Sequence, residues 1–164
     1  MARTWNRTSG DHMSTFEPQD LNFRARVHAS FARQKMMQII KARLRSVDAG
    51  VVEIELPFQE NLTQQHGFLH AGIIAAIGDN ACGYAALSLA PADTAVLTIE
   101  YKINLLAPAT GICLITSGRA IRPGRTITVC SGDVFTLSDG TDEKLIASML
   151  ATIMILRDRN DLVD

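Results

Sequence analysis

The amino-acid sequence predicts an α+β fold in which one antiparallel sheet wraps around a long central helix. Segments whose apolar and polar residues alternate with a period of two recur along the chain, as in half-buried strands. One stretch, residues 70–89, is instead apolar on nearly every face, as in a buried helix. Because the last strand segments follow one another through short turns, an antiparallel meander that covers this helix is the economical packing.

Length and composition bound what the chain can be. Its 164 residues can bury a core, and 47% of them are hydrophobic and 20% charged, as in an ordinary globular domain. The net charge of −1 gives no basic field for nucleic acid or an acidic membrane. Apolar runs such as 145–156 are too short to span a bilayer. We therefore expect neither nucleic acid nor a membrane as a partner.

We expect a single folded domain over residues 20–157, between a flexible segment at 1–19 and a charged tail at 158–164. Residues 1–12 are polar and without periodicity, and they are either native disorder or an expression leader. The N-terminus lacks the apolar stretch of a secretory signal.

The cysteines agree with a reducing compartment. Their number is odd and no two are close in sequence, which argues against a disulfide framework and against a structural zinc site. We expect buried, reduced thiols and a cytoplasmic location. The three residues are Cys82, Cys113 and Cys130.

The first half of the domain predicts a helix, a hairpin and a loop. Apolar side chains recur every four residues from Phe23 to Phe31, which indicates an amphipathic helix over about residues 20–38. Alternation on both sides of the turn at 48–50 predicts a hairpin between residues 41 and 58. A polar loop then leads to the apolar helix.

The second half predicts four strands in succession. In the first of them, residues 94–106, Ile99 and Tyr101 alternate with Thr98 and Glu100, which places Thr98 on the more polar face. The other strands are expected at about 112–122, 126–137 and 144–156, with turns at 122–125 and 139–140.

Asp79 is the one ionisable carboxylate between Glu60 and Asp93, and it stands within the apolar helix. Aspartate is a poor helix-interior residue, and its desolvation is unfavourable unless hydrogen bonds meet its charge. It is either an interface carboxylate hydrogen-bonded to a neighbour's backbone, or a desolvated general base or nucleophile. Gly78 and Gly83 each weaken the helix by about 1 kcal/mol, which favours close approach of another backbone such as that of a second subunit.

The segment from Gln64 to Gly72 leads directly into this helix. The first backbone N–H groups of a helix have no internal partners and lie at the positive end of its dipole. Small residues there, Ala71 and Gly72, let a carbonyl approach those donors, as an oxyanion site requires. Asp79 lies about 12 Å further along the axis, at about 1.5 Å per residue. The loop and Asp79 can therefore share one substrate only across two subunits.

Other chemistry near Asp79 is less favoured. His66 and His70 have a spacing suited to metal ligands, but no acidic or cysteine third ligand stands nearby. Cys82 lies on an apolar surface without the cation that would activate a thiol, and Ser88 has no base at useful spacing. We expect no metal ion and no organic cofactor.

At these residues the sequence resembles the PaaI-type hotdog thioesterases, which include phenylacetate-pathway and related acyl-CoA thioesterases. The loop ends in His70-Ala71-Gly72, where the family usually has His-Gly-Gly, and Asp79 follows on the helix. The strand 98–104 followed by Pro108 and the Gly124-Arg125 turn also match, so the resemblance spans about residues 20–157. It implies a hotdog fold, homodimers that pair into homotetramers, and an active site at the dimer interface.

The resemblance also implies roles for single residues. Asp79 takes the place of the carboxylate that attacks the thioester or activates water, and Ala71 stands where a glycine offers its N–H to the thioester oxygen. Gln64 replaces an asparagine that holds the water or the carbonyl, and Thr98 matches a residue that orients water. The remaining expected site residues are His70 as an orienting hydrogen-bond partner, Gly72 beside it, and Asn61, Arg122, Gly124 and Arg125 for substrate binding, the arginines suiting CoA phosphates.

The expected function is hydrolysis of an acyl-CoA thioester to the free acid and CoA, with the acyl group in an apolar slot between helix and sheet. The alternatives are a non-catalytic acyl-CoA-binding protein and a hydroxyacyl-thioester dehydratase. A dehydratase needs a histidine base beside the carboxylate, and the helix after Asp79 offers Tyr84 and no histidine. A repressor-type sensor needs a DNA-binding module, and the segment before Lys41 has one helix and no basic recognition pair.

Overall fold

The computed structural model describes residues 16–138, 143–157 and 162. Residues 1–15 of the expected flexible segment, the expected turn at 139–140 and, apart from Leu162, the expected tail at 158–164 lie outside the described residues. The described chain forms one six-stranded sheet in the order β1-β2-β4-β5-β6-β3, and every neighbouring pair is antiparallel. The strands are β1 Arg43–Asp48, β2 Val51–Pro57, β3 Ala95–Leu105, β4 Cys113–Arg122, β5 Ile127–Leu137 and β6 Glu143–Leu156.

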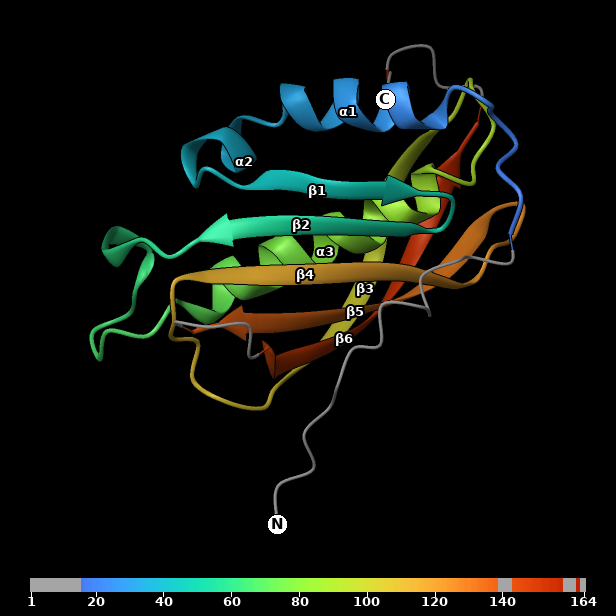
Figure 1. The fold of residues 1–164 in the computed structure, drawn as a ribbon. Helices are drawn as coiled ribbons and strands as arrows, with labels where there is room; N and C mark the ends of the chain where they lie inside the picture. The colour runs from blue at the N-terminus through green and yellow to red at the C-terminus, as the bar shows by residue number, and fades with distance from the viewer. Residues whose placement is uncertain (1–15, 139–142, 158–161, 163–164) are drawn as a thin grey trace.

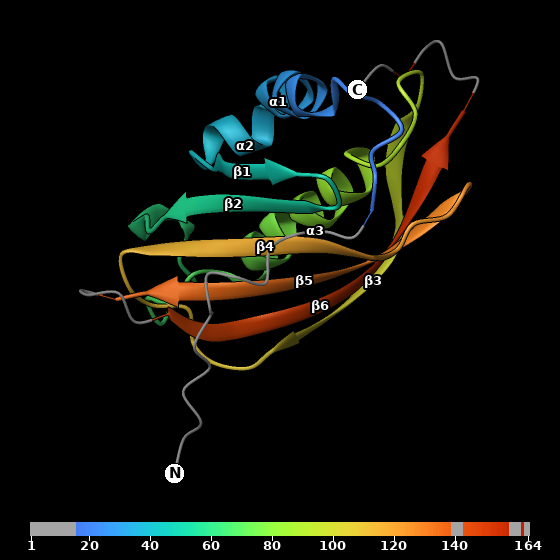
Figure 2. The same ribbon diagram turned by 45° about the vertical axis from the view of Figure 1, so that its right-hand side comes forward.

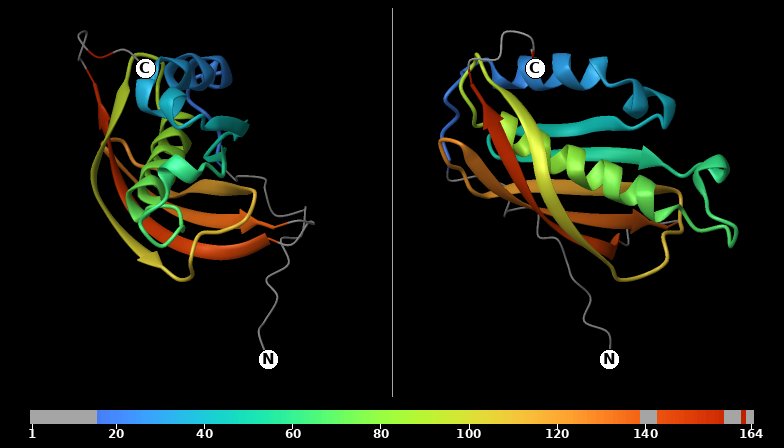
Figure 3. Two further views of the ribbon diagram at one scale, coloured as in Figure 1. Left: turned by 90° about the vertical axis from the view of Figure 1, so that its left-hand side faces the viewer. Right: turned by 180° about the vertical axis from the view of Figure 1, so that it is seen from behind.

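The sheet curves around one long helix, α3 Ala71–Leu87, which lies along its concave face (Figure 1; Figure 3). Ile77, Ala81 and Cys82 of α3 are fully enclosed, and Ala81 and Cys82 lie against the sheet. The predicted α+β hotdog architecture, a sheet wrapped around a central helix, is confirmed. None of the helices in the described ranges is long and apolar enough to cross a membrane.

Two glycines let α3 lie close to the sheet. Gly118 of β4 and Gly132 of β5 are cross-strand partners beneath the helix. A Cβ on Gly118 would lie 2.2 Å from the backbone carbon of Ala81, and one on Gly132 would lie 2.9 Å from Cys82 Sγ. The absence of these two side chains therefore fixes how deeply the helix sits.

The N-terminal helix is interrupted, contrary to the single helix predicted over 20–38. It forms α1 Phe23–Arg33 and α2 Lys35–Ile39, and Gln34 between them is extended, with φ −74° and ψ 100°. The break redirects the chain beside β1, as Figure 2 shows, so that Met37 of α2 is buried as well as the α1 residues. One straight helix could not bury both sets, which is the physical reason for the difference.

Arg26 joins α1 to the far end of α3. Its guanidinium donates to the carbonyl oxygens of Leu87, Ala90 and Pro91 at 2.7, 3.1 and 2.6 Å. It also forms an ion pair with Asp20 at 3.4 Å. A cation at the last carbonyls of a helix is favoured by the helix dipole, so Arg26 ties the N-terminal layer to the core.

The predicted hairpin and the predicted later strands are present, within a few residues of the expected bounds. The loop before α3 is more ordered than the sequence indicates. It contains a short 3-10 helix, η1 Glu60–Leu62, and an isolated antiparallel bridge between Thr63 and Leu69. This bridge closes the loop that carries Gln64, and His70, Ala71 and Gly72 follow directly after it.

Candidate active site

Thr98 reaches the helix because β3 contains a bulge. In the pairing with β6, Thr98 lies opposite Ile153 and Glu100 opposite Thr152, which leaves Ile99 as the extra residue. An extra residue inverts the alternation of side chains along a strand. The placement of Thr98 on the polar face with Glu100 is therefore wrong: Thr98 turns toward α3, while Glu100 accepts a hydrogen bond from Thr152 at 2.9 Å.

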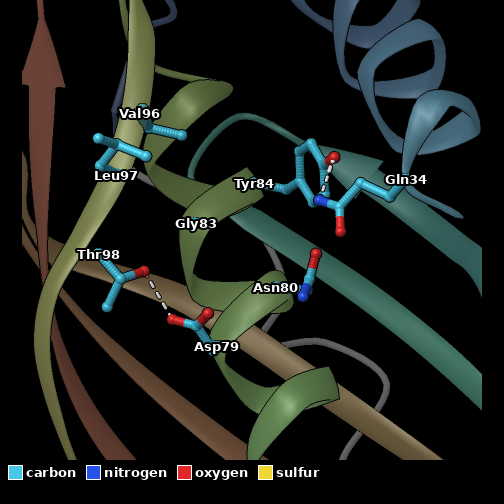
Figure 4. A pocket seen from close by; sticks show the side chains of 8 residues that line it. All are labelled: Gln34, Asp79, Asn80, Gly83, Tyr84, Val96, Leu97 and Thr98. Atoms are coloured by element: carbon cyan, nitrogen blue, oxygen red, sulfur yellow. Dashed lines mark hydrogen bonds between the residues drawn. The ribbon is translucent and has the colours of Figure 1, made fainter. Parts of the chain in front are cut away.

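Asp79 and Thr98 are hydrogen-bonded to each other. Thr98 Oγ1 donates to Asp79 Oδ1 at 2.6 Å, a short distance typical of a hydroxyl bound to a carboxylate. The partner of Asp79 within the chain is thus a side chain of β3 and not a backbone group. Both residues are half-buried and line a pocket of about 270 Å³, shown in Figure 4. This bond occupies Oδ1 of Asp79. The other oxygen, Oδ2, has no donor among the described residues.

The opposite wall of the pocket is polar. Gln34, at the break between α1 and α2, donates its Nε2–H to the hydroxyl of Tyr84 at 2.8 Å. Asn80 donates its Nδ2–H to the carbonyl of Ala76, one helical turn earlier, at 2.9 Å. Gly83 lies between this wall and the β3 wall in Figure 4, and a Cβ there would meet no atom within 4 Å. The expected apolar slot is therefore a pocket with a mixed lining.

The two helix glycines have different surroundings. A Cβ on Gly78 would lie 3.1 Å from Met149 Cε of the protein's own sheet. Packing within the chain therefore explains the glycine at position 78, and a second helix is not needed. Gly83 opens on the pocket. The interpretation that another backbone approaches both glycines is therefore wrong for Gly78 and stays a prediction for Gly83.

Among the first backbone donors of α3, those of Gly72, Ile73 and Ile74 are hydrogen-bonded to His70, whereas that of Ala71 is not. His70 is the N-cap, and its Nδ1 accepts the N–H of Gly72 at 2.9 Å. With Nδ1 as acceptor, a neutral His70 carries its proton on Nε2. The N–H of Ala71 has no acceptor among the described residues, and Ala71 is exposed. Ala71, and not Gly72, is thus the group that can meet a carbonyl oxygen.

Gln64 forms its hydrogen bonds within its own loop. Its backbone N–H donates to the Phe68 carbonyl at 2.8 Å, and its side-chain Oε1 accepts the backbone N–H of His66. The side-chain NH₂ remains as a donor. The role predicted for Gln64, holding water or a carbonyl, would therefore use that NH₂ or require the loop to open.

Within one chain the predicted site residues fall into separate groups. Asp79 and Thr98 share the pocket of Figure 4, whereas the loop of Gln64 to Gly72 does not line it. Asn61 borders a shallow groove with Lys41 and Glu60. Gly124 and Arg125 line a third depression with Arg157, which donates to the Arg125 carbonyl at 3.4 Å. Arg122 is exposed in β4, next to that depression.

The cysteines are not activated. Burial raises the pKa of Cys130 to about 12. Burial, and then the Cys130 thiol and the Asp79 carboxylate, raise the pKa of Cys82 well above its ordinary value. Because the thiolate is the reactive form, neither serves as a nucleophile near neutral pH. All three cysteines are free, and Cys113 is half-buried, so the prediction of buried thiols holds for the other two.

The sequence interpretation missed Gln34, Asn80 and Tyr84. Gln34 lies in the region predicted as a continuous helix, and no pattern marks the break that points it at Tyr84. Asn80 carried a usable signal, because a second polar residue directly after Asp79 in an apolar helix calls for an explanation as much as the aspartate does.

Comparison with known proteins agrees with this architecture. Residues 66–143 match the family model of the thioesterase superfamily. A Saccharolobus solfataricus protein named as an esterase is 32% identical over 123 residues, which cover 75% of this chain and 84% of the relative. A 1,4-dihydroxy-2-naphthoyl-CoA hydrolase of Listeria monocytogenes is 25% identical over 124 residues, covering 76% of this chain and 98% of the relative.

Solved structures agree as well. A thioesterase family protein from Silicibacter pomeroyi superposes with a TM-score of 0.81 at 44% identity, covering 82% of this chain and 98% of that one. The PaaI protein of Escherichia coli, from the phenylacetic acid degradation operon, superposes with a TM-score of 0.73, covering 82% and 94% of the two chains. Its 16% identity makes this second likeness one of fold alone.

Proposed function

Because this chain belongs to the thioesterase superfamily, as its resemblance to PaaI-type proteins predicts, we propose that it hydrolyses acyl-CoA thioesters at a site completed by a second subunit. The chain is a thioester hydrolase by family. The proposal concerns its substrate, its catalytic residues and its assembly.

The observation that carries the proposal is the hydrogen bond between Asp79 and Thr98. A carboxylate in the middle of a helix, with one oxygen held by a hydroxyl and the other facing a pocket, is oriented for reaction. Holding Oδ1 fixes the plane of the carboxylate, so that Oδ2 presents a lone pair in one direction. Such preorganisation is what a general base or a nucleophile requires.

In the first of two routes, Asp79 Oδ2 removes a proton from a water molecule. The water oxygen then bonds to the thioester carbon, and the carbonyl oxygen becomes an oxyanion. When this tetrahedral intermediate collapses, the carbon–sulfur bond breaks, the free acid forms, and CoA leaves as a thiolate that receives the proton from Asp79.

In the second route, Asp79 Oδ2 itself bonds to the thioester carbon. Collapse of that intermediate expels the CoA thiolate and leaves an acyl–aspartyl anhydride. Water then attacks the aspartyl carbon of the anhydride, which restores the Asp79 carboxylate, releases the acid and leaves one proton of the water for the CoA thiolate. The two routes place the oxygen from water differently, so a single turnover in ¹⁸O-water distinguishes them by whether label enters Asp79.

The oxyanion is received by Ala71 N–H of a second subunit. In one chain this donor lies about 12 Å along the helix from Asp79, at about 1.5 Å per residue, which is too far to serve one carbonyl. The N–H has no acceptor among the described residues and stands at the positive end of α3. Gln64 and His70 of the same subunit are proposed to position the carbonyl and the loop.

An unpaired sheet edge supports the dimer. Strand β3 ends the sheet, and within the part of the chain that the structure describes its backbone pairs with β6 alone. Apolar side chains that are about half exposed lie along it. An open apolar edge favours pairing with another strand, here β3 of a second copy. The apolar residues are Leu97, Ile99, Tyr101, Leu105 and, just beyond the strand, Leu106. Pairing of such dimers into tetramers is the further expectation.

CoA is the proposed carrier. The Listeria relative is named as a CoA hydrolase, and the arginine-bearing turn of this chain, Arg122 and Arg125 around Gly124, suits phosphate groups. Asn61 is a further proposed contact to the substrate. We propose no metal ion or organic cofactor, since each step above uses groups of the protein, the substrate and water.

The decisive experiment measures release of the CoA thiol from a panel of short, medium, long and aromatic acyl-CoAs. The wild-type protein should release thiol from at least one class, and Asp79→Asn should reduce kcat by about a thousandfold or more while its fold and oligomeric state remain. The matched control is the double variant Asp79→Asn/Asn80→Asp, in which the carboxylate is moved by one position. It should not restore turnover. Equally slow release by wild type and Asp79→Asn would contradict the proposal in favour of a non-catalytic acyl-CoA-binding protein.

A further inference from the structure

The pocket beside Asp79 presents two hydrogen-bond acceptors that the chain itself does not use. Asn80 donates its amide N–H to the Ala76 carbonyl. Because a carbonyl can only accept, this bond fixes the orientation of the amide and turns Asn80 Oδ1 into the pocket. No donor among the described residues meets this oxygen.

Gln34 presents the second acceptor. Its Nε2 is directed to the Tyr84 hydroxyl, so its Oε1 faces the other way. In Figure 4 the carbonyl oxygens of Gln34 and Asn80 are turned toward the same part of the pocket. Two acceptor dipoles directed at one space repel each other unless a donor lies between them.

The support behind Gln34 is rigid. Tyr84 is 4% exposed, its ring lies 5.7 Å from that of Phe31, and its hydroxyl lies 3.3 Å from Ser30 Oγ. These contacts hold the Tyr84 hydroxyl in place, and the hydroxyl holds Gln34. A polar side chain oriented by a buried partner is built to recognise a group, unlike a solvated surface glutamine.

The described residues that line the pocket include no cation. Its lining residues carry one formal charge, the carboxylate of Asp79, and its other polar groups are those of Gln34, Asn80, Tyr84 and Thr98. The site therefore attracts donors and disfavours anions. A terminal carboxylate or phosphate on the acyl group would be repelled, whereas a hydroxyl or an amino group would be bound.

We propose that Gln34 and Asn80 are specificity-determining residues that select acyl groups carrying a hydrogen-bond donor, a hydroxyl or an amino group, beyond the thioester carbonyl. The proposal rests on the proposed function, since it takes the carbonyl to lie at Asp79 and Thr98. The acyl group then crosses the floor at Gly83 and reaches Gln34 and Asn80 on the opposite wall. The pocket volume of about 270 Å³ suits a compact acyl group.

The test uses acyl-CoA sets that share one carbon skeleton and differ in one substituent: hydrogen, methyl, hydroxyl or amino. Methyl matches hydroxyl and amino in size but donates no hydrogen bond, so it separates recognition from filling of space. Wild-type protein should show kcat/KM at least about tenfold higher for the hydroxyl or the amino member than for the methyl member. Comparison of those two members identifies which donor is preferred.

Gln34→Leu should reduce this ratio to within about threefold of unity while kcat/KM for the methyl member stays equal or rises. Gln38→Leu is the matched control, because Gln38 is an exposed glutamine on neighbouring α2 that does not line the pocket. It should keep the wild-type ratio. If Gln34→Leu fails to fold, Asn80→Ala, a favourable helix substitution, provides the same comparison.

Dissociation constants for non-hydrolysable thioether analogues of the same sets, measured by calorimetry, keep this test separate from catalysis. Absence of thiol release from every acyl-CoA would overturn the proposed function, and the binding ratio would still report on Gln34. Equal kcat/KM and equal affinity for the methyl and donor members would overturn the inference alone. An unchanged ratio of kcat/KM between the donor and methyl members in Gln34→Leu would also overturn the inference. Dissociation of the Gln34→Leu oligomer in sedimentation would overturn it as well, because the two acceptors would then face the partner subunit.

Discussion

Gly118 of β4 lies directly beneath Ala81 of α3, so close that a single methyl group on the glycine would overlap the helix backbone. The ideal Cβ position is 2.2 Å from Ala81 C and 2.3 Å from its carbonyl oxygen. Backbone atoms cannot rotate away as a flexible side chain can. The depth of α3 in the sheet, and with it the position of Asp79 relative to Thr98, therefore depends on this glycine.

We predict that Gly118→Ala destabilises the protein by about 3 kcal/mol, because the helix must lift from the sheet. Urea unfolding followed by circular dichroism measures the change. Gly83→Ala in α3, where the added Cβ meets no atom within 4 Å, is the comparison and should not destabilise the protein. An unchanged midpoint for Gly118→Ala would contradict the close packing.

We predict that Gly83→Ala has the opposite effect on stability and a separate effect on activity. A Cβ at Gly83 meets nothing within 4 Å, and alanine is favoured over glycine in a helix by about 1 kcal/mol, so the unfolding free energy should rise. The added methyl narrows the floor of the pocket, so kcat/KM should fall more for bulky acyl groups than for acetyl-CoA. Equal losses for all acyl groups, or a shift toward monomer in sedimentation, would indicate that Gly83 faces the partner instead.

The sequence predicted the order of elements and the importance of Asp79, because hydrophobic periodicity and an ionisable residue in an apolar helix are local signals. It misplaced Thr98, since one extra residue in β3 inverts the face of a strand and no local pattern marks a bulge. The break at Gln34 was missed for a similar reason, because it is favoured by a contact with Tyr84, which is distant in sequence, and by the burial of Met37 in the core. In both cases, the face of Thr98 and the helix break at Gln34, tertiary packing outweighs the local periodicity of apolar side chains.

We predict that Thr98→Val lowers kcat about tenfold to a hundredfold, because it removes the hydroxyl that holds Asp79 while keeping the shape of the side chain. A hydrogen bond to a charged group contributes about 1.5–3 kcal/mol, which corresponds to that range. Thr98→Ser retains the hydroxyl and should stay within about threefold of wild type. If valine and serine have the same kcat, the bond has no role in turnover.

We predict that stability falls as pH rises above about 9, through the buried thiols. Burial raises the pKa of Cys130 to about 12 from the value of 9.0 for an exposed thiol. The folded state keeps the proton that the unfolded state releases, so the contribution is complete below pH 9 and is lost progressively between about pH 9 and 12. The loss is up to about 1.4 kcal/mol per pH unit for each thiol, and Cys82, whose pKa is also raised, acts in the same direction. Urea unfolding at pH 8 and pH 10 measures how steeply the free energy of unfolding falls with pH, and Cys130→Ala should reduce that slope. An unchanged slope in Cys130→Ala would show that other groups cause the pH dependence.

We predict that Ala71→Pro removes catalysis without removing the fold. Ala71 is the first residue of α3, where proline is favoured, and His70 before it is extended, with φ −64° and ψ 136°, as a residue before proline prefers. The substitution deletes the one backbone N–H proposed to receive the oxyanion, so kcat should fall about a hundredfold to a thousandfold. Ala71→Gly keeps that N–H and should retain turnover. Mixing inactive Ala71→Pro with inactive Asp79→Asn should restore activity, because one of the two shared sites in each heterodimer has both groups intact. A 1:1 mixture that pairs at random contains about one half heterodimers, so about a quarter of all sites should be active. Two inactive variants that never complement each other would place both groups in the same subunit and contradict the shared site.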